Sequence, residues 1–188
     1  MEVRIIDTFG SDQKISRMAR ISYGSTLPKE GAELKQFILK LLRDGHLVPF
    51  EHCAITYYLK VPIYVARQLV RYRTAVISER SLRYSEADSG EDELNSSSIN
   101  DACAYSYAVY RNLIKDGVLY EEARAILPLA TPTQMYYTMN IRNLMHLFDQ
   151  RISEHAQRQT RKVAERMLMY ARGRFPVTFT AYDALKKE

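Results

Sequence analysis

The scarcity and spacing of glycine constrain this chain more than any other feature of its sequence. Its seven glycines lie at positions 10, 24, 31, 45, 90, 117 and 173, and no two are within six residues of each other. Loops that cradle phosphates with backbone amides need closely spaced glycines, as in G-x-G-x-x-G and G-x-x-x-x-G-K-[ST]. The sequence therefore excludes both motifs, and side chains must do most of the work of holding any nucleotide.

Length and composition indicate one globular domain. The chain has 188 residues, of which 46% are hydrophobic and 26% charged, and a typical domain has roughly 150 residues. We therefore expect residues 1–188 to form a single domain. An acidic, serine-rich stretch over 85–100 is expected to join two halves of one fold rather than two domains.

The hydrophobic pattern predicts a mixture of strands and helices. Strands are expected over 1–8, 54–61 and 133–139, where β-branched and aromatic residues gather. The apolar residues of 30–44 follow the spacing of an amphipathic helix. Further helices are expected from Ser11 to Ile21, from Pro62 to Tyr72, over 102–115, over 120–126 and over 141–172 with a break near Ser153. Because these elements do not alternate as regular βαβ units, the pattern predicts the α+β class.

The charge balance indicates an anionic partner. Lysine and arginine outnumber aspartate and glutamate by 27 to 22, which gives a net charge of +5. Nucleic acid, nucleotides and phosphorylated cofactors all fit such a surplus. The first twenty residues lack the layout of a secretory signal, and no apolar run approaches the ~20 residues of a membrane span. We therefore expect a cytoplasmic protein without a membrane partner, with Cys53 and Cys103 as free thiols.

Five arginines fall within the seventeen residues from Arg67 to Arg83. Arg67, Gln68 and Arg71 lie on neighbouring faces of the helix expected after Pro62, and the other arginines follow in an expected loop. Guanidinium groups offer planar, paired donors that suit phosphate. A solvated basic helix end has the same composition, so the arginines alone leave both interpretations open.

A second candidate for a binding site is Arg151. On the helix expected from Ile141, the core face is formed by Leu144, Leu147 and Phe148, and Arg151 comes off that same face. An arginine on an apolar face is rarely buried without an anion. Its position therefore indicates a pocket.

Neither a metal site nor a nucleic-acid module is favoured. The four histidines, at positions 46, 52, 146 and 155, form no H-x-x-x-H motif and no Cys/His ligand set. Tyrosines interleaved with arginines could stack on the bases of a single strand. No recognised module frames them, so we expect Tyr57, Tyr105, Tyr110 and Tyr137 in the core or at its rim, and no nucleic-acid partner.

Five segments of the chain resemble the flavin-dependent thymidylate synthases. Arg71–Ser81, RYRTAVISERS, has the spacing of that family's R-H-R-x(7)-S signature. The other four resemble its motifs in the same order: Gly45–His52 (G-H-x-x-P-F-E-H), Ala66–Gln68 (A-R-Q), Ala123–Pro128 (A-R-x-x-L-P) and Asn140–Gln157 (N-x-R-x-L…R…H-A-Q). The resemblance extends from about Ile21 to Tyr182.

The resemblance implies a fold and a reaction. Members of this family convert dUMP to dTMP by moving a one-carbon unit from methylenetetrahydrofolate to C5, with reduced FAD as the hydride source and NADPH as the reductant of the flavin. It implies an α+β fold with a small, mainly antiparallel sheet that is not a Rossmann fold. It also implies a homotetramer whose active sites are shared between subunits, with a pyrimidine nucleotide and a folate as ligands.

The resemblance also assigns roles to individual residues. It implies nucleotide contacts for Gln68, Glu79, Ser81, Arg83, Arg124 and Arg151. Among these, Arg83 and Arg124 would hold the phosphate, while Arg151 at the pyrimidine and Ser81 would be catalytic. It implies FAD contacts for His46, Arg71, Tyr72, Arg73, Asn140 and His146, and no metal. A guanidinium at the uracil ring would stabilise the negative charge that builds as C5 becomes nucleophilic.

The sequence departs from the family pattern around the flavin and the nucleotide. Tyr72 replaces the signature histidine, which keeps an aromatic plane but loses a titratable imidazole. His146 replaces an asparagine, while Val76 and Ser78 replace a serine and an asparagine. Three alternatives therefore stay open: methylation of UMP in a biosynthetic side pathway, a nucleotide-binding relative that has lost flavin chemistry, and a basic RNA-binding protein.

Overall fold

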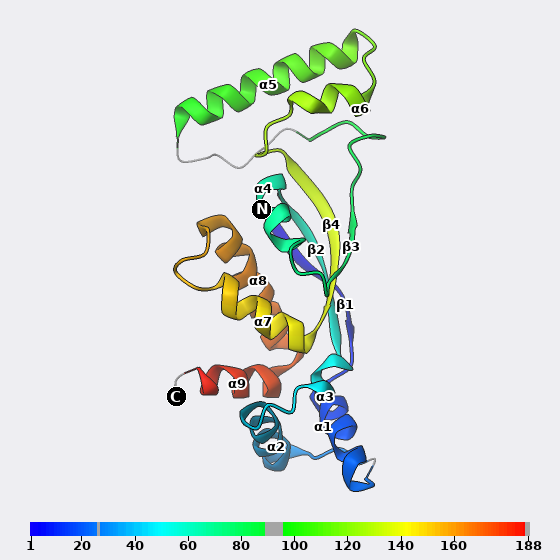
Figure 1. The fold of residues 1–188 in the computed structure, drawn as a ribbon, viewed down its shortest axis with the longest axis vertical. Coiled ribbons are helices and arrows are strands. Elements are labelled where there is room, and N and C mark those ends of the chain that lie inside the picture. Colours follow the sequence, from blue (N-terminus) through cyan, green and yellow to red (C-terminus); the bar gives the residue numbers. More distant parts are fainter. Residues whose placement is uncertain (26, 89–95, 187–188) are drawn as a thin grey trace.

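The chain folds around an antiparallel sheet with the strand order β1-β2-β4-β3 (Figure 1). The computed structural model describes residues 1–25, 27–88 and 96–186. The strands are β1 (Glu2–Phe9), β2 (Ala54–Pro62), β3 (Val76–Glu79) and β4 (Pro132–Asn140). β2 and β4 pair along their whole length, from Ala54 opposite Asn140 to Pro62 opposite Pro132. This long central pair is the frame on which the helices are arranged.

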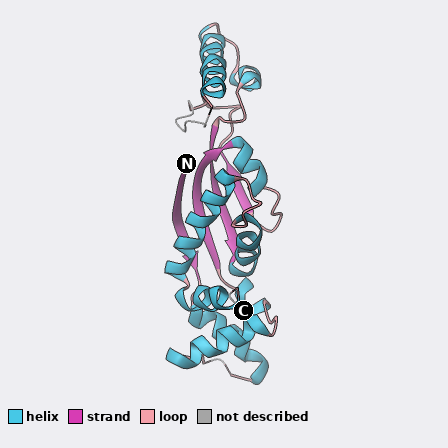
Figure 2. Ribbon diagram, turned by 90° about the vertical axis from the view of Figure 1, so that its left-hand side faces the viewer, coloured by secondary structure: helices cyan, strands magenta, loops and turns pink. Residues whose placement is uncertain are grey.

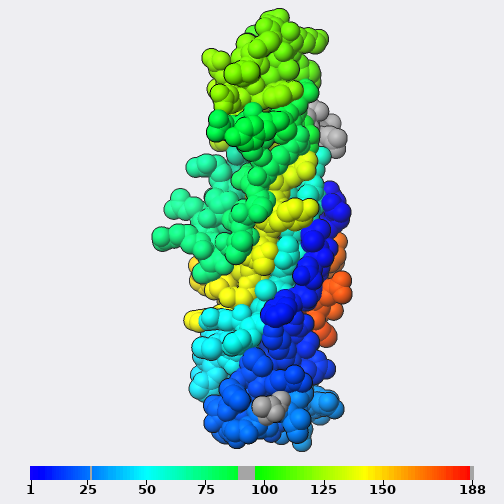
Figure 3. Space-filling model, turned by 90° about the vertical axis from the view of Figure 1, so that its right-hand side faces the viewer, coloured from blue at the N-terminus to red at the C-terminus, as the bar shows by residue number. Residues whose placement is uncertain are grey.

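The two faces of the sheet differ because side chains alternate along each strand. In β2 the odd-numbered residues from Ile55 to Val61 are fully buried, and they face the helices that cover one side of the sheet (Figure 2). The other side carries Tyr58 and Tyr136, whose ring centroids lie 6.0 Å apart, and the guanidinium of Arg4 lies 4.4 Å from the Tyr58 ring. This second face reaches the surface, where β1, β2 and β4 are visible in Figure 3.

Two of the described helices begin at a residue whose own side chain caps the first turn. Ser11 accepts from the backbone of Lys14 at 3.2 Å, and the side chain of Asn140 accepts from the backbone of Asn143 at 2.9 Å. The helical segments are α1 (Asp12–Arg20), η1 (Ile21–Tyr23), α2 (Gly31–Arg43), α3 (Val48–Glu51), α4 (Ile63–Leu69), α5 (Ser97–Lys115), α6 (Tyr120–Ala123), η2 (Arg124–Ile126), α7 (Ile141–Arg151), α8 (Arg158–Arg174) and α9 (Pro176–Leu185). No described helix has the length and apolar content that a membrane crossing requires.

The two ends of the sheet carry different helical groups. α1, α2 and α9 gather at one end, below the sheet in Figure 1, while α5 and α6 form an arm at the other end. The arm is fastened by two tyrosine hydroxyls: Tyr107 donates to Oγ1 of Thr131 at 3.1 Å, and Tyr110 accepts from the backbone of Ala87 at 3.1 Å. The arm therefore holds its position through polar contacts to the start of β4 and to the segment after β3.

Most of the predicted elements are confirmed. The α+β class, the small antiparallel sheet and the strands near 1–8, 54–61 and 133–139 are present, and the long C-terminal helix is broken between Arg151 and Arg158, as expected near Ser153. Tyr57, Tyr110 and Tyr137 are buried. Part of the expected linker over 85–100 lies outside the described residues, and its last four residues already belong to α5.

Four local predictions are wrong or incomplete. Residues 76–79, expected in a loop, form β3, because pairing with β4 makes this short segment an edge strand. The helix after Pro62 ends at Leu69 rather than Tyr72. Helices α3 and α9 have no counterpart among the predicted elements. Tyr105, expected in the core or at its rim, is 74% exposed, because the arm buries only the opposite side of α5.

Candidate active site

Arg151 lies at the end of α7 and its guanidinium faces the ring of Tyr72, in the turn after α4. Cζ of Arg151 is 5.3 Å from the centroid of the Tyr72 ring. Its Nε is buried and has no hydrogen-bond partner among the described residues. A buried donor without a partner is uncommon in folded proteins. The unpartnered Nε marks Arg151 as an unusual side chain, and the pocket that the sequence predicts around it stays a prediction.

Tyr72 and His146, both expected at the flavin, are brought together beside Arg151. Tyr72 is 9% exposed, and its Oη donates to Oε1 of Gln150 at 2.8 Å. Nε2 of Gln150 lies 3.1 Å from Nε2 of His146, and the His146 and Tyr72 rings meet edge-on with centroids 6.3 Å apart. Burial raises the pKa of Tyr72, although the nearby charge of Arg151 opposes this. The tyrosine is therefore a neutral hydrogen-bond donor at neutral pH.

The side-chain amide of Gln68 is held by two residues that the sequence pattern does not single out. Its Oε1 accepts from Oγ1 of Thr160 at 3.0 Å, and its Nε2 donates to Oε1 of Gln157. Thr160 is on α8 and Gln157 ends the loop that precedes it. The segment between α7 and α8 and the start of α8 therefore fix the amide of Gln68, four residues before Tyr72.

The two arginines expected at the phosphate meet at Glu121. Arg83 pairs with the Glu121 carboxylate through Nε at 3.0 Å and Nη2 at 2.9 Å, while Nε of Arg124 donates to the Glu121 backbone carbonyl at 3.2 Å. All three side chains are exposed. Glu121, in the first turn of α6, thus orients both guanidinium groups, and nothing in the sequence pattern selects it.

Glu79 and Ser81 make hydrogen bonds in the segment that connects β3 to Arg83. Oε1 of Glu79 accepts from Oγ1 of Thr133 at 2.7 Å. Oγ of Ser81 accepts from the backbone N–H of Arg83 at 3.3 Å, and its carbonyl accepts from Oγ of Ser85 at 3.1 Å. In this arrangement Ser81 shapes the turn that presents Arg83. Its expected catalytic role stays a prediction.

The remaining expected flavin contacts lie in two places, beside Tyr72 and at one end of the sheet. Arg71 and Arg73 are exposed on either side of Tyr72. His46 is exposed between α2 and α3, and Asn140 caps α7, so both lie at the end of the sheet opposite the arm (Figure 1). Within one chain the expected site residues therefore lie in three separate groups, one around Arg151, one around Glu121 and one near α3.

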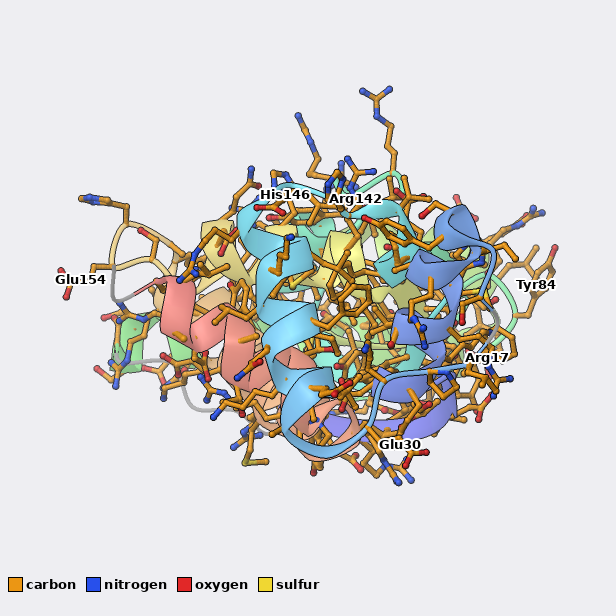
Figure 4. All side chains as sticks on the ribbon, turned by 90° about the horizontal axis from the view of Figure 1, so that it is seen from below. Arg17, Glu30, Tyr84, Arg142, His146 and Glu154 are labelled. Atoms are coloured by element: carbon orange, nitrogen blue, oxygen red, sulfur yellow. The ribbon has the colours of Figure 1, made fainter. Side chains whose placement is uncertain are left out.

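His146 lies on the outer side of α7, one turn after Arg142. Figure 4 shows the two side chains close together at the same edge of the molecule. The guanidinium of Arg142 is paired with the Glu51 carboxylate of α3. This pair ties the start of α7 to α3, so the helix that carries His146 and Arg151 is anchored at its far end. The described residues contain no cluster of side chains suited to a metal ion.

A hollow of about 290 Å³ lies on the open face of the sheet, beside Glu79. It is lined by Tyr58, Ser78, Glu79, Arg80, Gln134, Met135 and Tyr136. Its rim is tied by Asp88, which accepts from Arg80 and from Gln134, each at 3.0 Å. Burial by itself raises the pKa of Asp88, but hydrogen bonds from Arg80 and Gln134 and the nearby cations together lower it overall.

Comparison with known proteins places the whole chain in one group. A sequence profile described as "Thymidylate synthase complementing protein" matches residues 4–177. The flavin-dependent thymidylate synthase of Kosmotoga olearia is 32% identical, over 99% of this chain and 94% of the relative. That of Thermosipho africanus is 33% identical, over 96% and 90%.

Solved structures agree with these sequence matches. A UMP/dUMP methylase from Streptomyces cacaoi, crystallised with 5-Br dUMP, superimposes with a TM-score of 0.89 at 28% identity and covers 97% of this chain and 94% of that one. The same methylase with 5-Br UMP gives a TM-score of 0.84, with 97% and 93% covered. The predicted α+β fold is thus confirmed by a close structural match.

Proposed function

The chain belongs to the flavin-dependent thymidylate synthase family, and we propose that it is an enzyme that methylates C5 of a uridine nucleotide, with dUMP as its main substrate and dTMP as its product. The observation that carries the proposal is the environment of Arg151. Its guanidinium lies against Tyr72 with a buried Nε that no described residue satisfies. Arg151 as a whole remains partly exposed, and a planar cation held against an aromatic ring is suited to a uracil ring.

Arg151 would act by stabilising charge. Methyl transfer to C5 requires this carbon to become nucleophilic, and negative charge then builds on the pyrimidine. A guanidinium already fixed beside the ring stabilises that charge without having to reorganise. Gln68, whose amide is held by Thr160 and Gln157, is placed to orient the base, while Arg83 and Arg124 would bind the phosphate.

The residues present fit a flavin. Arg71 and Arg73 place two exposed guanidinium groups on either side of the buried Tyr72, and such groups suit a diphosphate. We propose that His46, Tyr72, Asn140 and His146 complete the FAD contacts. The bound flavin would supply the hydride, methylenetetrahydrofolate the carbon and NADPH the reducing equivalents.

A complete site would need more than one copy of the chain. The group around Glu121 lies by the arm, whereas His46 and Asn140 lie at the other end of the sheet (Figure 1). We propose that subunits of a homotetramer bring these groups together. The proposal keeps residues 1–188 as one domain and places the reaction in the cytoplasm, with no nucleic-acid partner.

UMP is a second candidate substrate. The structural relative from Streptomyces cacaoi is named a UMP/dUMP methylase and was crystallised with analogues of both nucleotides. In this chain Ser78 lines the hollow beside Glu79, and Val76 lies on the same strand. Their small or apolar side chains leave room for a ribose 2′-hydroxyl if the sugar lies there.

The test begins with the visible spectrum of the purified protein after gel filtration with added FAD. We expect flavin bands to stay with the protein. Turnover of dUMP and of UMP is then measured with methylenetetrahydrofolate and NADPH, and we expect dUMP to be converted faster. Bound flavin without methylation of either nucleotide would refute the proposal, and the absence of flavin uptake would favour a nucleotide-binding relative.

Variants locate the site. Arg151→Ala is expected to reduce turnover at least 100-fold while leaving flavin bound, because the guanidinium that it removes contacts the pyrimidine and not the flavin. Arg71→Ala is expected to lose flavin instead. Arg17→Ala is the matched control, since it removes an exposed guanidinium on α1, away from His146 in Figure 4. Normal turnover in Arg151→Ala would contradict the assignment.

A further inference from the structure

Gln150 connects Tyr72 to His146 through the two ends of its amide. Oε1 accepts from the Tyr72 hydroxyl at 2.8 Å, and Nε2 lies 3.1 Å from Nε2 of His146. A primary amide accepts only at its oxygen and donates only at its nitrogen. Both ends of this amide are therefore engaged within the protein. Gln150 is therefore placed to hold its two neighbours relative to each other.

The guanidinium of Arg151 packs against the ring of Tyr72. Cζ of Arg151 is 5.3 Å from the ring centroid, a distance at which a cation is attracted to an aromatic face. Nε of Arg151 has no hydrogen-bond partner among the described residues, whereas the side chain also interacts with Tyr72 through a hydrogen bond, so Tyr72 helps to set the position of the guanidinium. A rotation of the ring would therefore move the guanidinium with it.

The hydrogen bonds of Gln150 run in one direction in this structure. Its Oε1 accepts from Tyr72 and its Nε2 faces His146, so the amide donates when Nε2 of that imidazole is the acceptor. If the amide turned over, its NH2 would point at the Tyr72 hydroxyl and the bond that orients the tyrosine would reverse. With its proton on Nδ1, His146 presents an acceptor at Nε2 and in that tautomer selects this orientation of the amide.

We propose that Gln150 is a positioning residue for the reaction, which holds Tyr72 by its hydroxyl, is itself oriented by His146, and so fixes the guanidinium of Arg151 at the pyrimidine. The inference rests on the proposed function, because only there does Arg151 contact a substrate. It implies that Tyr72 and His146, besides contacting the flavin, also help to position the arginine that contacts the nucleotide. It also gives a physical reason for a tyrosine in the signature: a phenol hydroxyl reaches Gln150 while its ring supports the arginine.

The test is a mutant cycle on the flavin-loaded protein, with the dUMP dissociation constant measured by calorimetry. Gln150→Leu removes the amide at similar volume, and we expect dUMP to bind about tenfold more weakly, on the order of the loss of one hydrogen bond. In an Arg151→Lys background, where no planar group is left to orient, the same change should alter the dissociation constant less than twofold. Equal losses in both backgrounds would overturn the inference, because a merely structural role would act equally in each.

Conservative variants supply a second route. Tyr72→Phe removes only the hydroxyl and should weaken dUMP binding as much as Gln150→Leu, with no further loss in the double variant. His146→Gln supplies a carbonyl acceptor and should bind dUMP more tightly than His146→Leu, which should resemble Gln150→Leu. Equal losses in the two His146 variants would overturn the inference.

The controls separate the inference from the proposed function. Gln13→Leu removes an exposed glutamine on α1 and should bind dUMP and flavin normally. If the unmodified protein binds neither dUMP nor UMP, the proposed function fails and the inference fails with it. If it binds and methylates dUMP but Gln150→Leu acts equally in both Arg151 backgrounds, only the inference fails.

Discussion

Asp12 is expected to contribute more to the stability of this protein than any exposed carboxylate. Its side chain is 5% exposed and accepts three hydrogen bonds at the start of α9. The donors are the backbone N–H of Val177 at 3.0 Å, the backbone N–H of Thr178 at 2.9 Å and the Thr178 hydroxyl at 2.6 Å. A residue of α1 therefore caps a helix 165 positions away in the sequence.

The expected loss follows from these contacts. Asp12→Ala leaves two backbone donors and one hydroxyl near the core without a partner, and each such group costs about 1–3 kcal/mol. Part of this is returned because a buried carboxylate no longer has to be desolvated. We therefore expect the free energy of unfolding to fall by about 3–5 kcal/mol, which for a chain of this size lowers Tm by roughly 10 °C.

The assay is urea unfolding followed by circular dichroism, at one fixed protein concentration. Asp12→Asn keeps one acceptor but turns an NH2 toward Val177, so it should lose less than Asp12→Ala. Asp101→Ala, at an exposed position on α5, is the control and should change the midpoint little. The reasoning fails if Asp12→Ala costs less than about 1 kcal/mol, or if Thr178→Val adds its full loss in that background.

Three further predictions concern other parts of the molecule. Gly10→Ala should destabilise the fold strongly, because Gly10 has φ +98° and an added Cβ would lie 2.3 Å from Sγ of the buried Cys53. A Tm within 2 °C of the unmodified protein, which corresponds to a loss of roughly 1 kcal/mol or less, would contradict this. The folded pKa of Asp88 is lowered, so its contribution to stability is present above about pH 4 and is lost as the pH falls through the folded pKa. Unfolding midpoints should therefore differ between Asp88→Asn and the unmodified protein at neutral pH and converge in acid; a constant difference would count against it. Arg83→Ala should raise the KM for the nucleotide about tenfold without loss of flavin, and an unchanged KM would remove Arg83 from the phosphate site.

Part of the candidate site can be predicted from the sequence because it depends on local spacing. Arg151 stands out by its place on the apolar face of a helix, and the structure puts its guanidinium beside Tyr72 with a buried Nε. Gln150, next to it in the sequence, has no role in the sequence prediction. Its spacing of four residues from His146 is the signal that could have suggested the pair. Nothing local points to Tyr72 as its other partner, 78 residues away.

Several elements follow from short-range signals in the amino-acid sequence alone. Alternation along β2 and β4, the helical spacing over 30–44 and the caps at Ser11 and Asn140 all act within a few residues. The wide spacing of the glycines is a signal of the same kind, and it excludes nucleotide sites that are built on glycine-rich loops.

Which polar groups meet depends instead on how distant segments pack. The strand β3 exists because β4 offers it an edge, Asp12 caps α9 across 165 positions, and Glu121 gathers two arginines from separate segments. A hydrophobic pattern states which side of an element is buried, whereas a hydrogen bond requires one particular partner at one distance and angle. That partner is set by the tertiary arrangement of the elements, and packing between distant segments leaves no periodic trace in the sequence.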